Sequence, residues 1–589
     1  MTGPQPPSGA TAAKDRLFAP VSLAIVCLLF LLAVALSEWH TYPFGDEIAF
    51  VPQLARSDFS EWFLRGFTDY FRTYGEWSPS ESHYIRPIVH AALWAIYALC
   101  SGLPYRAFVL ICVLAFCAVL YLGASLVRRS ALDLGASGGA ASAIGWLFLL
   151  NPSVINNGLT AIPFQFDVLA GVFAVAAFRS AWKGSTFAPL CFLLLAVFTK
   201  ETALPAPLAA ALSSWLVARR VGRSVLLLLP LAIWAAVYSY ALGPAVLGEE
   251  ATPYSGSQGL AFELLRGAMI WPSGALDVDT LHEIVIHLGF GPGDAGGLAT
   301  SRAVLSFLAI GLNLVLWLVI AAVLAKLLRP TLLLLKTGAS PDVARIYSAT
   351  WLLAALAFDV ANAHEARYGG TLYPLLLVAG VLVLYGPRPL FRGRALAFLR
   401  PAATAATAAA FLLHGVGWTA EKLAYYRDNP TKSLHHALTA MRDAPSRVYV
   451  ASAPGFFASP ESLRIAWNLP FEPVFLYQFE GCGRASGGSA VLRGNEFAAT
   501  LPGCAEIALH TADARLLLPG LRGSVHREGV GNYRFPEGRV VMPSIRRPEV
   551  PIVDFGRGIV VDFDPAQAPF ELLAYDWSTG TYRRVTPSR

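Results

Sequence analysis

Long apolar runs separated by short polar turns fill the first 420 residues of the chain. The run from Phe18 to Leu36 is about long enough to cross a bilayer, because a spanning helix needs roughly 20 apolar residues. The basic residues Lys14 and Arg16 precede it, and no convincing cleavage site follows it, so we predict an uncleaved signal anchor. The other apolar runs are Pro87–Cys100, Tyr105–Val127, Ser137–Leu150, Asp167–Phe178, Phe187–Phe198, Thr202–Ala218, Val225–Leu242, Ala303–Leu324, Ile346–Ala361, Leu372–Tyr385 and Ala402–Val416.

Two longer polar segments, residues 37–86 and 243–302, interrupt these runs. The first is rich in aromatic and acidic residues. Its pieces Glu61–Leu64 and Phe67–Phe71 suit amphipathic helices that lie in the interface between lipid and water. Several apolar runs are too short for a straight crossing, and such helices are tolerated where protein or a water-filled cavity covers them.

The composition agrees with a chain that is mostly surrounded by lipid. Of the 589 residues, 55% are hydrophobic and 14% are charged, whereas soluble domains carry about 25% charged residues. A soluble enzyme, a coiled coil, a collagen-like chain and a disordered chain are thereby excluded. The net charge of +6, from 45 basic and 39 acidic residues, is too small and too dispersed to indicate nucleic-acid binding.

The placement of basic residues predicts the topology. Six groups of turn and tail residues contain 17 basic residues and three acids, and such turns face the cytoplasm. All six can do so only if Pro87–Cys100 does not cross the membrane, so we predict that it lies on or dips into the outer leaflet. Eleven crossings remain, with the N-terminus inside. The basic residues are Lys14, Arg16, Arg128, Arg129, Arg179, Lys183, Arg219, Arg220, Arg223, Lys326, Arg329, Lys336, Arg345, Arg388, Arg392, Arg394 and Arg400.

From about Glu421 the pattern changes to turns rich in Pro and Gly and short strand-like runs, such as Arg447–Ala453 and Gly558–Phe563. We predict an α+β soluble domain on the outer side of the membrane. Cys482 and Cys504 are its only cysteines, and a disulfide between them would fit an oxidising compartment. No Cys/His spacing typical of a metal site occurs, so we predict no metal ligands.

With this topology, several ionisable residues fall at one membrane face, where charged groups cost about 2.5–3.5 kcal/mol each and usually mark function. They are Asp46, Glu47, Arg86, Asp167, Lys200, Glu201, His364, Arg367 and Tyr368. Structural explanations exist for several of them. The Asp46–Glu47 pair could be a solvated flank, Lys200 and Glu201 could be a snorkelling ion pair, and Arg86 could anchor a helix that starts at Pro87.

Taken in order, these motifs resemble the GT-C membrane glycosyltransferases, above all the protein O-mannosyltransferase branch (family 39) and bacterial transferases that modify lipid A and surface polysaccharide. The matching features are an outer-face Asp46-Glu47, Tyr84-Ile85-Arg86-Pro87, an Asn151-Pro152 turn leading to Asp167, Thr199-Lys200-Glu201-Thr202-Ala203-Leu204-Pro205, and Arg367-Tyr368. The resemblance covers residues 15–420. Gln165-Phe166-Asp167 departs from the Arg-x-Asp of some relatives, and the resemblance does not extend to the C-terminal domain.

The resemblance implies a hexosyl- or pentosyltransferase that takes its sugar from a polyprenyl-phosphate carrier. Asp46, supported by Glu47, would deprotonate the acceptor hydroxyl, and a single carboxylate base implies inversion. Lys200 and Arg367 would offset the charge of the leaving phosphate. Arg86, Asp167, Glu201 and Tyr368 would orient the phosphate or the sugar. The expected partners are lipid, a lipid-linked sugar, and an acceptor glycan, lipid or protein; dependence on a divalent metal stays open.

The predicted protein is therefore a polytopic α-helical membrane protein of the bacterial inner membrane. Residues 1–17 form a cytoplasmic tail, 18–420 a GT-C-like domain with periplasmic loops at 37–86 and 243–302, and 421–589 a periplasmic domain. The alternative is a transporter or flippase for a lipid-linked saccharide. A transporter is typically built from internal repeats with polar residues near the bilayer midplane, whereas here no repeat is visible and the acids lie at one face.

Overall fold

The computed structural model describes residues 9–35, 54–68, 85–151 and 165–242 and, with gaps, residues 314–362 and 430–586. Helices make up the N-terminal part. Their bounds are α1 Gly9–Ala35, α3 Phe59–Thr68, α4 Pro87–Leu99, α5 Tyr105–Asp133, α6 Gly138–Leu149, α8 Gln165–Trp182, α9 Phe187–Thr199, the 3₁₀ turn η4 Glu201–Ala203, α10 Pro205–Ala218, α11 Val221–Leu242 and α15 Val343–Asn362. The apolar runs of the sequence thus form helices wherever the structure describes them.

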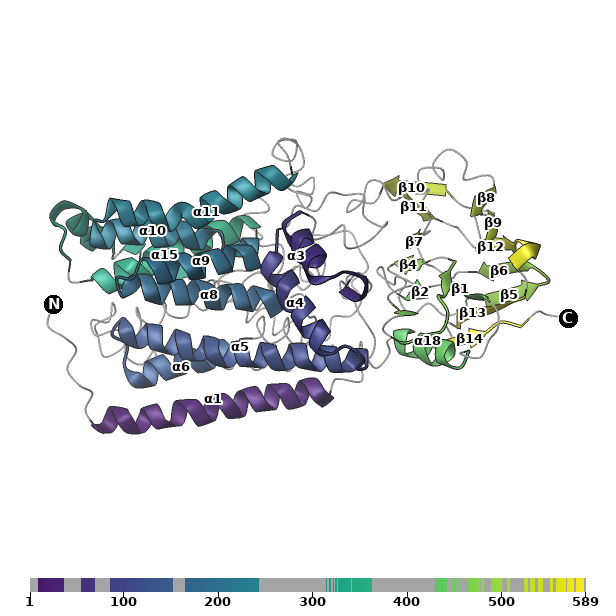
Figure 1. The fold of residues 1–589 in the computed structure, drawn as a ribbon, viewed down its shortest axis with the longest axis horizontal. Helices are drawn as coiled ribbons and strands as arrows, with labels where there is room; N and C mark the ends of the chain where they lie inside the picture. The colour runs from purple at the N-terminus through teal and green to yellow at the C-terminus, as the bar shows by residue number, and fades with distance from the viewer. Residues whose placement is uncertain are drawn as a thin grey trace.

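The helices form an elongated bundle (Figure 1). The long helices lie along one common direction, and contacts join α5 to α1, α6 and α8, α9 to α8 and α11, and α10 to α11 and α15. The helices α3 and α4 are turned out of this direction and lie at the end of the bundle nearest the strand-rich domain (Figure 1). That Pro87–Cys100 does not cross the membrane stays a prediction.

Small residues allow the helices of the bundle to approach one another closely. A Cβ atom at Gly123 of α5 would lie 2.8 Å from the side chains of Phe148 and Val172, and one at Gly145 of α6 would lie 2.6 Å from the ring of Phe18. Such contacts are typical of helix packing in membranes, where close van der Waals contact replaces the hydrophobic effect as the driving force.

The basic turns lie together at one end of the bundle. The Nε of Arg179, in the last turn of α8, donates to the Oδ2 of Asp133 at the end of α5, at 2.6 Å. The Nη2 of Arg223, near the start of α11, donates to the carbonyl oxygens of Ala181 and Ser185 at 2.7 and 2.6 Å. The turns after α5, α8 and α10 therefore share one end, and the turn between α9 and α10 lies at the opposite end.

Three helices are long and apolar enough to cross a membrane within the described part of the chain: Leu17–Val34, Tyr105–Asp133 and Val221–Tyr240. The total of eleven crossings stays a prediction, because Leu372–Tyr385 and Ala402–Val416 lie outside the described residues. The helix α1 begins nine residues before the predicted anchor, where Ala-rich sequence favours helix. The predicted run Thr202–Ala218 is divided into η4 and α10, because Pro is favoured at the first position of a helix.

The C-terminal part is a strand-rich domain with one described α-helix, α18, at Pro430–Thr439. Its strands are β1 Arg447–Ala451, β2 Ala453–Pro454, β3 Val474–Phe475, β4 Gln478–Glu480, β5 Ser489–Arg493, β6 Glu496–Thr500, β7 Glu506–Ala508, β8 Ser524–Arg527, β9 Gly531–Arg534, β10 Arg539–Pro543, β11 Pro551–Asp554, β12 Gly558–Phe563, β13 Phe570–Asp576 and β14 Thr581–Arg584. The short 3₁₀ turn η7 spans Pro565–Gln567. The two runs predicted as strands, 447–453 and 558–563, form β1 with β2 and β12.

Three sheets make up this domain. Their orders are β14-β13-β1-β3, β10-β11-β7-β4-β2 and β5-β6-β12-β9-β8. In the first sheet, β1 pairs in parallel with both β13 and β3, and it is buried on both faces, as central parallel strands are. Tyr449 and Ala451 pack with the third sheet, whereas Val448 and Val450 pack with α18. The alternation of side chains in one strand thus joins a helical layer, a mixed sheet and an antiparallel sheet.

Candidate functional site

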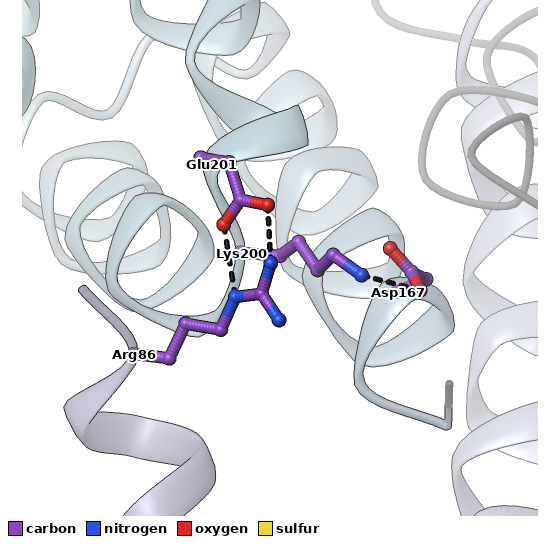
Figure 2. A network of polar contacts seen from close by, with 4 residues as sticks. All are labelled: Arg86, Asp167, Lys200 and Glu201. Atoms are coloured by element: carbon purple, nitrogen blue, oxygen red, sulfur yellow. Dashed lines mark hydrogen bonds and ion pairs between the residues drawn. The ribbon is translucent and has the colours of Figure 1, made fainter. Parts of the chain in front are cut away.

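Four of the ionisable residues singled out in the sequence lie together (Figure 2). The segments that supply them are at the end of the bundle opposite the basic turns. Arg86 lies immediately before α4, Asp167 lies in the first turn of α8, and Lys200 and Glu201 lie in the turn between α9 and α10. We call Arg86, Asp167, Lys200 and Glu201 the charged quartet. Three separate segments of the chain therefore supply its four side chains.

The backbone at Lys200 explains why neighbouring side chains have different partners. The helix α9 ends at Thr199, and Lys200 adopts an extended conformation with φ −155° and ψ 137° before η4 begins. In extended backbone, successive side chains point to opposite sides. Figure 2 accordingly shows Lys200 pointing to Asp167 and Glu201 pointing to Arg86. Pro205 then starts α10.

The ion pair between Lys200 and Asp167 is deeply buried. The Nζ of Lys200 donates to the Oδ2 of Asp167 at 2.8 Å, and the two side chains are 5% and 0% exposed. Asp167 lies in the first turn of α8, where the helix dipole stabilises a negative charge. The ammonium and the carboxylate stabilise each other in these surroundings, because breaking a buried pair leaves an uncompensated charge.

The pair between Arg86 and Glu201 is bidentate. The Nε of Arg86 donates to the Oε2 of Glu201 at 2.9 Å, and its Nη2 donates to the Oε1. The side chains are 9% and 21% exposed, so this pair lies closer to solvent than the pair of Lys200 and Asp167. Two parallel hydrogen bonds fix the plane of the guanidinium as well as its position.

The quartet contains two cations and two anions, so its formal charges cancel. Each cation is held in place by its own carboxylate, which gives a fixed set of hydrogen-bond donors at the end of the bundle. Fixed donors of this kind can stabilise negative charge that develops in a reaction, because they need no reorganisation when it appears. The arrangement suits the recognition of an anionic group, and phosphate is the anion that Arg recognises through its planar fork.

The remaining candidates lie outside the described residues: Asp46, Glu47, His364, Arg367, Tyr368, Cys482 and Cys504. Their proximity to the quartet, and the disulfide, stay predictions. Within the described part of the chain, no group of three or more His, Cys, Asp or Glu side chains could hold a metal ion.

Sequence reasoning overlooked two residues beside the quartet. Trp62 of α3 and His90 of α4 bond to each other next to Arg86. A lone histidine in the apolar run Pro87–Cys100 was the one signal that could have drawn attention to this contact.

No protein-family model matches the chain, and no curated protein matches it. Among solved structures, the crystal structure of ArnT from Cupriavidus metallidurans bound to undecaprenyl phosphate is similar along most of the chain. The sequences are 13% identical, the TM-score is 0.43, and the match covers 93% of this chain and 98% of that chain.

Proposed function

We propose that the protein is a bacterial inner-membrane glycosyltransferase that transfers a sugar from a polyprenyl-phosphate carrier to an acceptor hydroxyl on the periplasmic face. The observation that supports this most is the buried charged quartet. It lies at the end of the helical bundle opposite the basic turns, where a lipid phosphate at the membrane surface could reach it. Ionisable groups buried in such a position usually serve a function.

Charge balance suggests separate roles for the quartet and for Arg367 in stabilising the phosphate. A sugar linked to polyprenyl phosphate is a phosphodiester with one negative charge, and the leaving lipid phosphate carries up to two. Because Asp167 and Glu201 already neutralise Lys200 and Arg86, the quartet supplies directed donors but no net positive charge. We assign the additional cation to Arg367, with Tyr368 beside it to orient the phosphate or the sugar.

The proposed base is Asp46, supported by Glu47. The acceptor hydroxyl must lose its proton as it attacks the anomeric carbon, and a carboxylate within hydrogen-bond reach can accept that proton. The departing lipid phosphate is a good leaving group and needs no general acid. Direct displacement by one attacking oxygen inverts the anomeric configuration. Both a hexose and a pentose fit this scheme, because the chemistry at the anomeric carbon is the same.

The proposed topology follows the two ends of the bundle. The basic end, with Arg179 and Arg223, faces the cytoplasm, as positive turns do. The end with the quartet and α4 then faces the periplasm, and the strand-rich domain lies on the same side. This places the reaction where nucleotide sugars are absent and lipid-linked sugars are the available donors.

A transfer assay in detergent tests the proposal against the alternative of a flippase. Purified protein is mixed with polyprenyl-phosphate sugar and envelope acceptors, and product is detected by mass spectrometry. A flippase moves a lipid from one leaflet of a bilayer to the other and forms no glycosidic bond. It therefore yields no product in detergent micelles, which have no leaflets. Envelope glycans from cells with and without the gene identify the sugar and acceptor.

Asp46→Asn serves as the inactive variant, and Glu61→Gln, which changes an exposed acid in the same loop, serves as its control. Product formed equally by Asp46→Asn would contradict the assignment of the base.

A further inference from the structure

The short helix α3 is joined to α4 by a reciprocal contact between two buried side chains. The Nε1 of Trp62 donates to the carbonyl oxygen of His90 at 2.8 Å, and the Nδ1 of His90 lies 2.7 Å from the carbonyl oxygen of Trp62. Because a carbonyl only accepts, Nδ1 carries the proton of the ring. The two rings also stack, with centroids 4.4 Å apart, and both side chains are about 1% exposed. Two hydrogen bonds and a stack fix this contact in distance and orientation.

One helical turn further along α3, Gly66 contacts the start of α4. Its carbonyl oxygen accepts the backbone N–H of Arg86 at 2.8 Å. A Cβ atom at position 66 would lie 2.6 Å from the Cα of Pro87, so only glycine allows this approach. The backbone of Arg86 is therefore held by α3 while its side chain is held by Glu201.

The adjacent face of α3 contacts α9. The rings of Phe63 and Phe67, one turn apart on α3, lie 5.3 Å from each other, and Phe67 lies 5.9 Å from Phe198. Phe198 is two residues before Lys200 at the end of α9. The helix α3 thus contacts both segments whose charged side chains meet in the quartet, the start of α4 and the end of α9.

We infer that α3 is a positioning helix, and that Trp62, Gly66 and His90 act through Arg86 to hold its guanidinium against the phosphate of the lipid-linked donor. This inference rests on the proposed function. It assigns a task in the reaction to α3, the part of the first polar loop for which the sequence predicted only interfacial helices. The three residues touch neither donor nor acceptor in this assignment; they set the place of the residue that does.

Gly66→Ala is the test variant, and Gly222→Ala is its matched control. Alanine is the better helix former, so the substitution does not weaken α3 itself; it forces α3 away from Pro87. At Gly222, also helical, no atom lies within 4 Å of the added Cβ. We expect Gly66→Ala to raise the KM for polyprenyl-phosphate sugar and to lower kcat/KM about 10- to 100-fold, because displacements of about 1 Å can cause losses of this size. Gly222→Ala should keep wild-type kinetics.

A mutant cycle with Arg86→Lys separates positioning from general damage. If Gly66 acts through Arg86, Gly66→Ala should lower kcat/KM less than about twofold in the Arg86→Lys background, since the bidentate geometry is already lost. Equal losses in both backgrounds, or wild-type kinetics for Gly66→Ala, would overturn the inference. Trp62→Phe, which keeps the stacked ring but removes the N–H donor, provides the same cycle should Gly66→Ala fold poorly. A wild type that transfers no sugar refutes the proposed function itself, whereas an active wild type with unaffected variants refutes the positioning role alone.

Discussion

Replacing Asp167 by Leu should destabilise the protein strongly, because it leaves the ammonium of Lys200 without its counter-ion. The lost contact is a 2.8 Å hydrogen bond between side chains that are 5% and 0% exposed. Removing one partner of such a buried pair typically costs about 3–5 kcal/mol. We expect Asp167→Leu to lower the free energy of unfolding in detergent by this amount, measured by denaturant titration of the purified protein.

The double variant Asp167→Leu with Lys200→Met should regain most of the lost stability. Both charges are then gone, and apolar side chains of similar volume replace a buried pair with little loss or with a gain. This variant separates structure from chemistry, because it folds without the ammonium. If Lys200 donates to the donor phosphate, kcat/KM should fall about 10- to 10²-fold, since a hydrogen bond to a charged group contributes about 1.5–3 kcal/mol.

Two results would refute this reasoning. A loss below about 1 kcal/mol for Asp167→Leu would mean that the ammonium of Lys200 is hydrated and that the pair is not buried in the folded protein. Wild-type turnover of the double variant would mean that the pair of Lys200 and Asp167 only supports the fold, and the assignment of Lys200 to the donor phosphate would be withdrawn.

Three further predictions concern residues that the sequence singled out. Asp46→Asn should lower the rate of transfer about 10²–10⁴-fold, the usual contribution of a general base, while binding of the lipid donor, measured by isothermal titration, stays near wild type. Cys482 and Cys504 should form a disulfide that stabilises the C-terminal domain by roughly 3 kcal/mol for a loop of about 20 residues; non-reducing peptide mapping that finds two free thiols would contradict it. Reporter fusions after Ser130 and after Trp418 should be cytoplasmic and periplasmic, respectively, and a periplasmic signal after Ser130 would contradict the topology.

The helices of the bundle were predictable from the sequence, because each depends on the local pattern of apolar residues and on the residues that flank it. Apolar runs gave the ends of α4, α6 and α9 to within one residue, since turn and capping residues flank each run. The basic turns predicted that Pro87–Cys100 lies on or dips into the outer leaflet; this stays a prediction, and the structure shows only that α4 is turned out of the common direction of the bundle (Figure 1). The extension of α5 to Asp133 was not predicted, because Arg128 and Arg129 end the apolar run without ending the helix.

The ion-pair partners within the quartet could not be predicted, because the pairing depends on contacts between segments that are far apart in the sequence. The sequence suggested an ion pair between the neighbours Lys200 and Glu201. The extended backbone of Lys200 instead sends the two side chains apart, to Asp167 and to Arg86. These contacts join residues 33 and 115 positions apart. Spacing along the chain identifies the charged turns, but only the packing of α4, α8 and α9 determines which carboxylate meets which cation.

The neutrality of the quartet has a consequence for turnover under the proposed function. The leaving lipid phosphate is more negative than the donor phosphodiester, so a site of uncompensated cations would bind the product more tightly than the substrate and release it slowly. Carboxylates fixed beside Lys200 and Arg86 reduce that difference while leaving hydrogen-bond donors in place. Only interactions that are stronger in the transition state than in the bound states raise kcat. Two paired cations and one further cation, assigned to Arg367, therefore suit repeated transfer better than three unpaired cations would.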